Sequence, residues 1–237
     1  MMSGSLPPDY NEMWTQVYSD LSYKGPTHRH LRRLVAKMLH GIEYESVLDV
    51  GCGPGIHWEL LARGRKLKRY TGVDISAWAL ERARQLTGGE GYLLDIQKER
   101  LDGHWDLVFC SLVLEHLPDD VAALRNMRAM TGKYFLATTI AGDFERYRRW
   151  DERVGHVRNY RPGELEQKAA AVGFKVRRAI YWGFPFYSPI VRSLQNYCQI
   201  GIGPFNRMTS LIATLLYWLY FLNSHRRGDV LVLLAEV

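Results

Sequence analysis

From residue 46 onward, short apolar runs alternate with stretches in which apolar residues recur at helical spacing. Five of the runs are strand-like, namely SVLDV, RYTGVD, GYLL, WDLVFC and KYFLATT. The helical stretches between them include IHWELLARG, SAWALERARQL and DDVAALRNMRAM. Strands that alternate with helices in this way predict βαβ units, in which helices cover both faces of a parallel sheet.

Two more strands are expected toward the end of the chain. GELEQKAAAVG has the pattern of another helix, and FKVRRAIYW follows it as a strand. The final run, DVLVLLAEV, is strongly apolar and rich in β-branched residues, which is typical of a buried strand. The predicted sheet therefore has seven strands.

The stretch VLDVGCGPG, residues 47–55, places three glycines directly after a predicted strand. Glycine lets the backbone turn tightly and lets a ligand approach closely, and the following helix offers free backbone N–H groups. A dinucleotide-binding loop has the spacing GxGxxG, whereas this loop is GxGxG and residue 56 is isoleucine. Asp74 ends the next strand, in GVDIS, where a carboxylate can accept hydrogen bonds from both ribose hydroxyls. The spacing therefore disfavours a nicotinamide-dependent oxidoreductase.

Four motifs occur in the order VLDVGCGPG, GVDIS, YLLDI and WDLVFCSLVLEHLPD. Together they resemble the class I S-adenosylmethionine-dependent methyltransferases, and within them the small-molecule group that includes lipoquinone methyltransferases. The resemblance covers roughly Val47 to Thr139, with weaker support to Gly173. It implies an α/β fold with a Rossmann-like, doubly wound sheet, mainly parallel with an antiparallel last strand. It also implies S-adenosylmethionine as the cofactor.

The resemblance assigns roles to individual residues. Gly51, Gly53 and Gly55 would surround the methionine part of the cofactor, with Asp49 beneath the loop. Further contacts would come from Asp74 and Ile75, Asp95 and Ile96, and Ser111 and Leu112. In this scheme Asp74 holds the ribose hydroxyls, Asp95 accepts from the adenine amino group, and the last pair lines the methionine side.

Two histidines are candidates for a general base. His116, in LEHLPD, follows the fourth strand, and His156, in GHVRNYRPGEL, precedes a predicted helix. A histidine can take a proton near neutral pH. The alternatives are a capping or packing role for His116 near Asp119 and a turn-ordering role for His156. No paired ligand spacing links the histidines, so the sequence predicts no metal site.

Residues 1–45 are predicted to be helical and to carry the aromatic side chains Tyr10, Trp14, Tyr18 and Tyr23. One interpretation is an N-terminal helical lid over the cofactor, with Tyr18 as a cofactor contact. The alternative is an amphipathic helix of the core. We expect a single methyltransferase domain over residues 1–237, within which this segment is one of two additions.

The second addition is an apolar helical insertion over residues 183–228, before the last strand. From Ala179 to His225 only Arg192 and Arg207 carry a fixed charge. Its most apolar part, residues 208–222, is shorter than the about 20 residues that span a bilayer. Strands on either side must also pair in one sheet, so a single crossing is excluded. We expect a helix over the substrate end of the sheet with part of its apolar face exposed. A buried helical addition and a homodimer interface are the alternatives to a substrate cover or membrane contact.

The overall composition limits the partners. The net charge is +6, but the basic residues are scattered, so no nucleic acid partner is expected. Three separated cysteines without a CxxC motif fit a reducing compartment, and the start of the chain has no apolar signal region. We expect a cytoplasmic protein, peripheral at a membrane if the insertion contacts lipid.

The expected function is methyl transfer from S-adenosylmethionine to oxygen or carbon of a lipophilic small molecule. The alternatives are an N- or sugar-directed methyltransferase and a cofactor-binding scaffold without catalysis.

Overall fold

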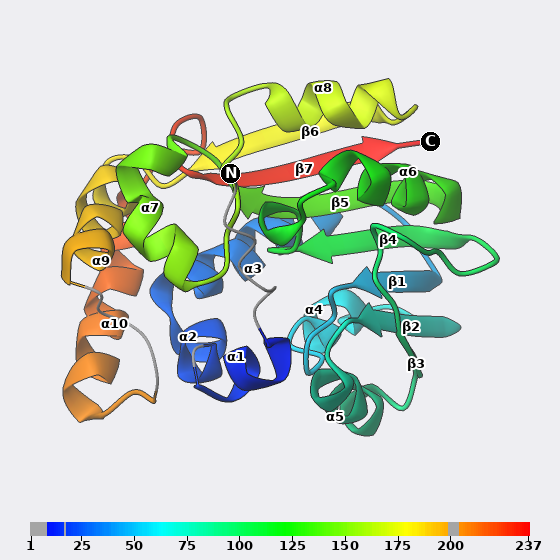
Figure 1. Cartoon of the computed structure of the whole chain (residues 1–237), viewed down its shortest axis with the longest axis horizontal. Coiled ribbons are helices and arrows are strands. Elements are labelled where there is room, and N and C mark those ends of the chain that lie inside the picture. Colours follow the sequence, from blue (N-terminus) through cyan, green and yellow to red (C-terminus); the bar gives the residue numbers. More distant parts are fainter. Residues whose placement is uncertain (1–8, 17, 199–203) are drawn as a thin grey trace, which may run out of the picture.

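The computed structural model describes residues 9–16, 18–198 and 204–237. Its centre is one seven-stranded sheet with the strand order β3-β2-β1-β4-β5-β7-β6 (Figure 1). The strands are β1 Ser46–Val50, β2 Arg69–Asp74, β3 Glu90–Leu93, β4 Trp105–Ser111, β5 Thr131–Ile140, β6 Lys175–Trp182 and β7 Val230–Glu236.

The pairing confirms the predicted mixed sheet. Neighbouring strands from β3 through β5 are parallel. The last strand, β7, lies between β5 and β6 and is antiparallel to both, so that Val232 is paired with Thr138 on one side and Ile180 on the other. The strand order reverses between β1 and β4, and in open α/β sheets ligands bind at such a reversal, beyond the carboxyl ends of the strands.

The helical elements fill the connections. They are α1 Tyr10–Gln16, α2 Ser19–Lys24, α3 Pro26–Leu39, α4 Trp58–Ala62, α5 Ala77–Thr87, η1 Leu114–His116, α6 Asp120–Met130, α7 Phe144–Arg153, α8 Glu164–Ala171, η2 Phe186–Val191, α9 Arg192–Cys198, α10 Arg207–Leu219 and η3 Tyr220–Leu222. The sequence predicted α4, α5, α6 and α8. The sequence analysis named no helix at the position of α7.

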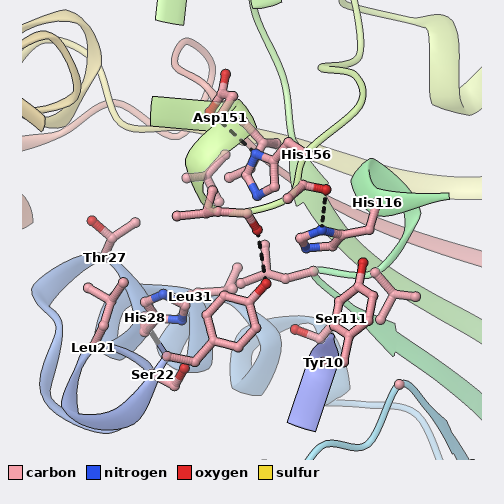
Figure 2. A pocket seen from close by; sticks show the side chains of 18 of the residues that line it. Tyr10, Leu21, Ser22, Thr27, His28, Leu31, Ser111, His116, Asp151 and His156 are labelled. Atoms are coloured by element: carbon pink, nitrogen blue, oxygen red, sulfur yellow. Dashed lines mark hydrogen bonds and ion pairs between the residues drawn. The ribbon is translucent and has the colours of Figure 1, made fainter. Parts of the chain in front are cut away.

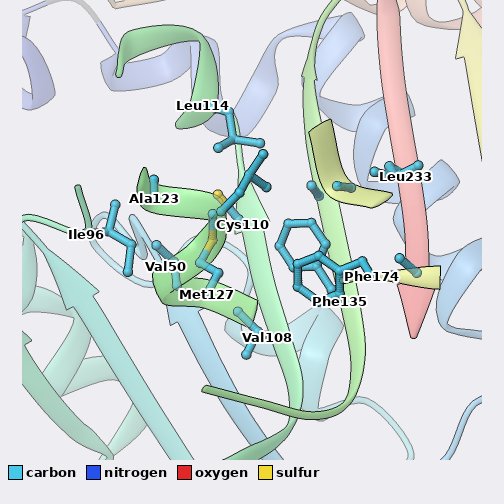
Figure 3. Close-up of a cluster of buried hydrophobic side chains, with 14 of the residues drawn as sticks. Val50, Ile96, Val108, Cys110, Leu114, Ala123, Met127, Phe135, Phe174 and Leu233 are labelled. Carbon is cyan, nitrogen blue, oxygen red and sulfur yellow. The ribbon is translucent and has the colours of Figure 1, made fainter. Parts of the chain in front are cut away.

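Both faces of the sheet are buried. Along β7, Leu231 and Leu233 face a core that includes α6 and α8, whereas Val230 and Val232 face a core that includes α3. This alternation follows from the two-residue period of a strand, and it explains why DVLVLLAEV is apolar at nearly every position. Figure 3 shows the first core, in which the rings of Phe135 and Phe174 stack with centroids 4.5 Å apart.

The N-terminal segment divides into two parts. Leu31, Leu34 and Val35 of α3 are at most 2% exposed and pack on the sheet, so α3 is a core helix and the expected lid cannot extend to residue 45. The shorter α1 is attached at the opposite end of the sheet, where the Asn11 side-chain oxygen accepts a 2.8 Å hydrogen bond from the Ser76 hydroxyl.

The insertion is helical, as predicted. α10 and η3 together cover the charge-free stretch from Met208 to Leu222. Leu215 is 61% exposed and Leu219 is 36% exposed, so these two positions lie outside the core. Among the described residues, no helix is both long enough and apolar enough to cross a membrane.

Candidate functional site

A cavity of about 1120 Å³ opens beyond the carboxyl ends of β1, β2 and β4. Ten of the thirteen site residues predicted from the sequence line it: Tyr18, Gly51, Asp74, Ile75, Asp95, Ile96, Ser111, Leu112, His116 and His156. Figure 2 shows how helices α1 to α3, the β4 end and the segment after α7 converge on this space. The volume is slightly above the upper end of the roughly 300–1,000 Å³ that is typical of a small-molecule site.

Asp49 does not line the cavity. It is 1% exposed within β1 and accepts a 2.8 Å hydrogen bond from the hydroxyl of Tyr70. Burial raises the pKa of Asp49 to about 7. The Asp49 side chain therefore joins β1 to the neighbouring strand β2, and its predicted position beneath the cofactor-binding loop stays a prediction.

Gly53 and Gly55 also lie outside the cavity lining. A Cβ on Gly53 would lie 2.4 Å from the indole of Trp14, so this glycine admits the α1 aromatic ring. A Cβ on Gly55 would lie 3.2 Å from Leu86, which places this glycine against α5. The predicted ligand contacts of these two glycines are therefore replaced by packing contacts with helices.

Asp74 is fixed by the loop that it faces. Its Oδ2 accepts from the Gly53 N–H and its Oδ1 from the Ser76 N–H, each at 2.8 Å. Burial raises the pKa of Asp74, although these backbone donors oppose the shift. A carboxylate oxygen accepts more than one hydrogen bond, so each oxygen retains capacity for a hydroxyl of a ligand in the cavity.

The segments that follow β1 and β4 pack closely against each other and contain residues with positive φ angles. Gly51 has a φ of +68°, and a Cβ there would lie 2.2 Å from Val113. Leu112 has a φ of 55°, which is uncommon for a residue with a side chain and tends to occur at functional sites. Its N–H donates to the Thr138 carbonyl at 2.9 Å, which helps to hold this conformation at the cavity wall.

The edge near β3 is polar and charged. Asp95 forms a 2.9 Å ion pair with Lys98 and accepts hydrogen bonds from the backbone and side chain of Gln97. Partial burial opposes ionisation, but the Lys98 and Gln97 hydrogen bonds outweigh it and lower the pKa of Asp95. Ile75 is 49% exposed beside it and offers an apolar surface to a flat ring.

His116 is held in one tautomer. Its Nδ1 lies 2.9 Å from the carbonyl oxygen of Gly155, and because a carbonyl only accepts, Nδ1 carries the proton. Burial lowers the pKa of His116 to about 3, helped by the neighbouring His156. The ring is therefore neutral at ordinary pH, with its lone pair on Nε2.

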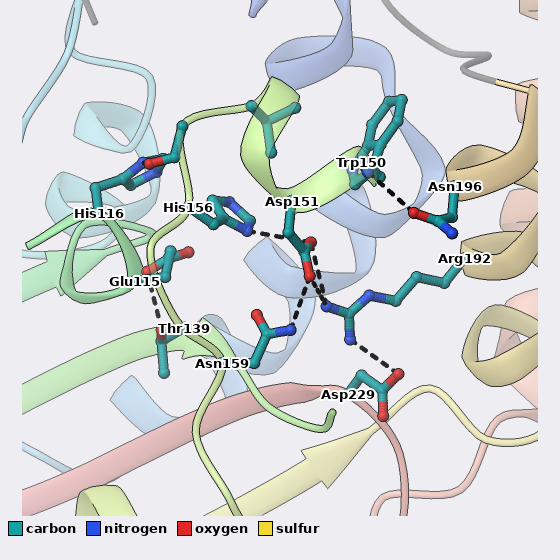
Figure 4. Close-up of polar contacts among 12 residues, drawn as sticks. Glu115, His116, Thr139, Trp150, Asp151, His156, Asn159, Arg192, Asn196 and Asp229 are labelled. Carbon is teal, nitrogen blue, oxygen red and sulfur yellow. Dashed lines mark hydrogen bonds and ion pairs between the residues drawn. The ribbon is translucent and has the colours of Figure 1, made fainter. Parts of the chain in front are cut away.

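His156 lies against His116, with ring centroids 4.8 Å apart. Its Nδ1 is 3.3 Å from Oδ1 of Asp151, an ion-pair contact (Figure 4). Asp151 is 1% exposed. Burial opposes its ionisation, but His156, Arg192 and Asn159 together lower the pKa of Asp151. The result is an imidazole beside a buried carboxylate, an arrangement typical of a proton acceptor.

Glu115 lies close to the two histidines and forms a cluster with them. It is fully buried, its Oε2 accepts a 2.9 Å hydrogen bond from the Thr139 hydroxyl, and its Oε1 has no hydrogen-bond partner. Burial raises the pKa of Glu115. One donor atom each from Glu115, His116 and His156 lie within 4.8 Å of one another. This group could hold a metal ion, whereas the sequence predicted no metal site, because its members come from two segments far apart in the chain.

The opposite end of the cavity is largely apolar. Its apolar lining consists of Leu21, Leu31, Tyr187, Val191, Ile212, Ala213, Leu216 and Tyr220. The polar side chains of Ser22, Thr27 and His28 lie beside Leu21 and Leu31 (Figure 2). Tyr18 borders both ends, and its hydroxyl donates to the Val154 carbonyl at 2.9 Å. The insertion thus supplies much of the apolar lining.

Sequence reasoning missed Asp151 and Arg192, both of which line the cavity. A signal for Arg192 was present, since it is one of only two fixed charges in a long apolar segment, and a charge in such a place requires a buried partner. Asp151 gave no such signal within its run of basic residues.

Comparisons with known proteins identify the family and the fold. A family model described as "Methyltransferase domain" matches residues 23–179. The chain is 34% identical over 109 residues to a ubiquinone biosynthesis O-methyltransferase of Pseudomonas paraeruginosa, a match that covers 41% of this chain and 46% of that protein. The chain thus spans about half the length of the curated relatives it matches.

Two solved structures share the fold. The N-methyltransferase NodS from Bradyrhizobium japonicum, in complex with S-adenosyl-l-homocysteine, has a TM-score of 0.62 at 18% identity and covers 96% of this chain and 95% of its own. Magnesium protoporphyrin IX methyltransferase from Synechocystis PCC 6803, with bound SAM, has a TM-score of 0.58 at 16% identity and covers 97% of this chain and 92% of its own.

Proposed function

Because the chain belongs to the methyltransferase-domain family, we propose that it transfers the methyl group of S-adenosylmethionine to oxygen or carbon of a lipophilic small molecule. The observation that carries this proposal is that eight of the eleven predicted cofactor residues and both histidines line one cavity with a polar end and a largely apolar end. The similarity to a ubiquinone biosynthesis O-methyltransferase supports an acceptor of this class.

The polar end fits the cofactor. Asp74, with capacity left on both oxygens, suits the ribose hydroxyls, and the exposed Ile75 suits the adenine face. Asp95 provides an acceptor for the adenine amino group. The close contact that a Cβ on Gly51 would make with Val113 leaves only backbone at the end of β1, where the methionine part would lie. When bound, S-adenosylmethionine supplies an electrophilic methyl group on a sulfonium, and an in-line nucleophile takes it with release of the thioether.

The apolar end suits the acceptor. Its walls come from α2, α3 and the insertion, and the charge of Arg192 among them is paired with two carboxylates. An acceptor with an apolar body would be held by this surface, with its reacting atom toward the histidines. Fixing the nucleophile in this way can supply roughly 7–11 kcal/mol of the barrier.

We assign proton removal to His156 rather than His116. A group with a pKa of about 3, such as His116, is a weak proton acceptor. His156 has the Asp151 carboxylate at Nδ1, which stabilises the imidazolium that forms when a hydroxyl or an acidic carbon gives up its proton. His116 then serves to orient the acceptor through its Nε2 lone pair.

The exposed side of the insertion suggests a contact with a lipid surface. One face of α10 and η3 is exposed over four turns, at Met208, Leu211, Leu215, Trp218 and Leu222, and large exposed apolar patches mark interaction sites. Two arginines of α3 lie beside these helices: Arg29 lies over Tyr217 and Arg33 over Phe221. An apolar helix face with cationic side chains beside it is the arrangement that binds an anionic bilayer from the surface.

The helices α1 and α2 are proposed as the lid. Tyr10, Trp14 and Tyr18 line the cavity from above, and together with α3 they close its N-terminal side. With residues 183–228 as the acceptor cover, the whole chain forms a single catalytic domain.

Calorimetric titration tests the cofactor assignment. S-adenosylhomocysteine should bind with one site per chain, and NAD should not bind. Binding of NAD without binding of S-adenosylhomocysteine would overturn the proposal.

A further inference from the structure

The insertion places one guanidinium in the interior of the protein. Arg192, the first residue of α9, is 1% exposed. It forms ion pairs with Asp151 at 3.0 Å and with Asp229 at 2.9 Å, and it donates to the Ala141 carbonyl at 2.9 Å. Its guanidinium carbon lies 4.1 Å from the centre of the Tyr147 ring. A buried cation is costly unless its hydrogen bonds are satisfied, and these contacts satisfy it.

Asp151 connects this cation to the histidines. Oδ2 of its carboxylate accepts hydrogen bonds from Nη2 of Arg192 and, at 2.7 Å, from Asn159. The remaining contact of Oδ1 is with Nδ1 of His156, at 3.3 Å. Figure 4 shows Asp229, Arg192, Asp151 and His156 joined by successive polar contacts that lead from the insertion to the cavity.

We propose that Arg192 is a positioning residue for His156: it fixes the Asp151 carboxylate, which in turn orients the imidazole toward the acceptor. This inference rests on the proposed function, in which His156 takes the proton. It makes the insertion part of the reacting site as well as its cover.

Arg192 restricts the motion of the Asp151 carboxylate. Without Arg192, Asp151 keeps Asn159 and His156 as partners but loses the cation that holds it in a dry interior. The carboxylate is then free to rotate or to recruit water, and His156 loses its fixed orientation. A small displacement of a catalytic group lowers turnover strongly while it leaves ligand affinity nearly unchanged.

A purely structural role for Arg192 would be to fasten α9 to α7. Asn196 provides the matched control, because it lies one turn further along α9 and its Oδ1 accepts a 3.0 Å hydrogen bond from the Trp150 N–H of α7. It fastens the same two helices, because its Nδ2 also donates to the Arg146 carbonyl of α7 at 3.3 Å.

The test compares Arg192→Met, Arg192→Lys and Asn196→Ala in the full chain. Arg192→Met should lower kcat about 10- to 100-fold, a part of the roughly 10²–10⁴ that a positioned base contributes, with S-adenosylhomocysteine affinity unchanged. Arg192→Lys should recover part of kcat, and Asn196→Ala should lower the melting temperature but keep kcat within about threefold. In a His156→Ala background, Arg192→Met should cause no further loss.

A second readout does not need an acceptor. In a sample labelled with ¹⁵N-histidine, the His156 Nδ1 resonance, which reports the contact with the Asp151 carboxylate, should shift in Arg192→Met and stay unchanged in Asn196→Ala. An unchanged resonance, an unchanged kcat, or an undiminished loss in the His156→Ala background would each overturn the inference. If Arg192→Met fails to fold, the same comparisons with Arg192→Lys decide. If His156→Ala itself keeps wild-type turnover, the proposed base is wrong, and the resonance alone then tells whether Arg192 positions the ring.

Discussion

The Nδ1 of His116 donates to the carbonyl oxygen of Gly155, 39 positions further along the chain, at 2.9 Å. This bond joins the segment after β4 to the loop after α7, and it brings His116 and His156 together with ring centroids 4.8 Å apart. The two candidate histidines thus occupy one corner of the cavity but differ in their partners, and this difference predicts different effects of their removal.

His156→Ala should lower turnover by about 10²–10⁴, because the proton acceptor is lost. His116→Ala should have a smaller effect, since a ring with a pKa of about 3 accepts protons poorly. Single-turnover kinetics with labelled cofactor measure both, and calorimetry with S-adenosylhomocysteine checks that binding is retained. A larger loss in His116→Ala than in His156→Ala would reverse the assignment.

Asp74→Ala should weaken S-adenosylhomocysteine binding by about 1.5–3 kcal/mol, the usual cost of losing hydrogen bonds to a charged group. The exposed carboxylate Asp102, outside the cavity, provides the control variant Asp102→Ala, which should bind normally. Equal dissociation constants for Asp74→Ala and wild type, in a folded variant, would remove Asp74 from the cofactor site.

The sequence predicted most of the fold because its strands and glycine loop carry local patterns. The continuous apolar run DVLVLLAEV indicates a buried strand from its local sequence alone. The ends of VLDVGCGPG and GVDIS likewise indicate strand ends without any knowledge of tertiary contacts. The antiparallel direction of the last strand followed from the resemblance, whereas its position between β5 and β6 was not predicted.

The sequence predicted less of the site, because several contacts depend on distant segments. Nothing near Gly53 indicates that Trp14 would pack on it, and nothing near Asp151 indicates Arg192, which is 41 positions away. The cluster of Glu115, His116 and His156 likewise arises only when the loop after α7 folds back onto η1. Such contacts are set by tertiary packing, which residue spacing alone does not encode.

Leu215→Glu should abolish flotation of the protein with anionic liposomes at low salt while it leaves cofactor affinity intact, because Leu215 is 61% exposed and lies on the proposed contact face. Leu86→Glu changes the net charge equally at a position that is 54% exposed on α5, and it should still float. If wild type does not float, or if Leu215→Glu only dissociates a dimer in sedimentation experiments, the lipid contact is wrong.

Stability should fall as the pH drops below about 6.5. His57 is 5% exposed, and burial lowers its pKa to about 3, so below an unfolded-state pKa of about 6.5 the unfolded chain binds a proton that the folded chain does not. This one group lowers the free energy of unfolding by up to about 1.4 kcal/mol per pH unit as the pH falls from about 6 to about 4.

His57→Phe should remove that part of the slope in urea titrations at a series of pH values, since a phenyl ring keeps the edge contact with Phe109. His104→Phe, at an exposed position, is the comparison. A slope in His57→Phe as steep as in wild type would show that His57 does not cause the acid sensitivity.

The most direct test of the account is a methyl-transfer assay with S-adenosylmethionine labelled in its methyl group, incubated with a lipid and metabolite extract and followed by mass spectrometry. We expect wild type to place the label in a product that extracts into organic solvent and is heavier than its precursor by one CH₂ unit, and His156→Ala to leave that product nearly unlabelled. Label that appears only in water-soluble amines or sugars, or no labelled product from an enzyme that binds the cofactor, would contradict the account.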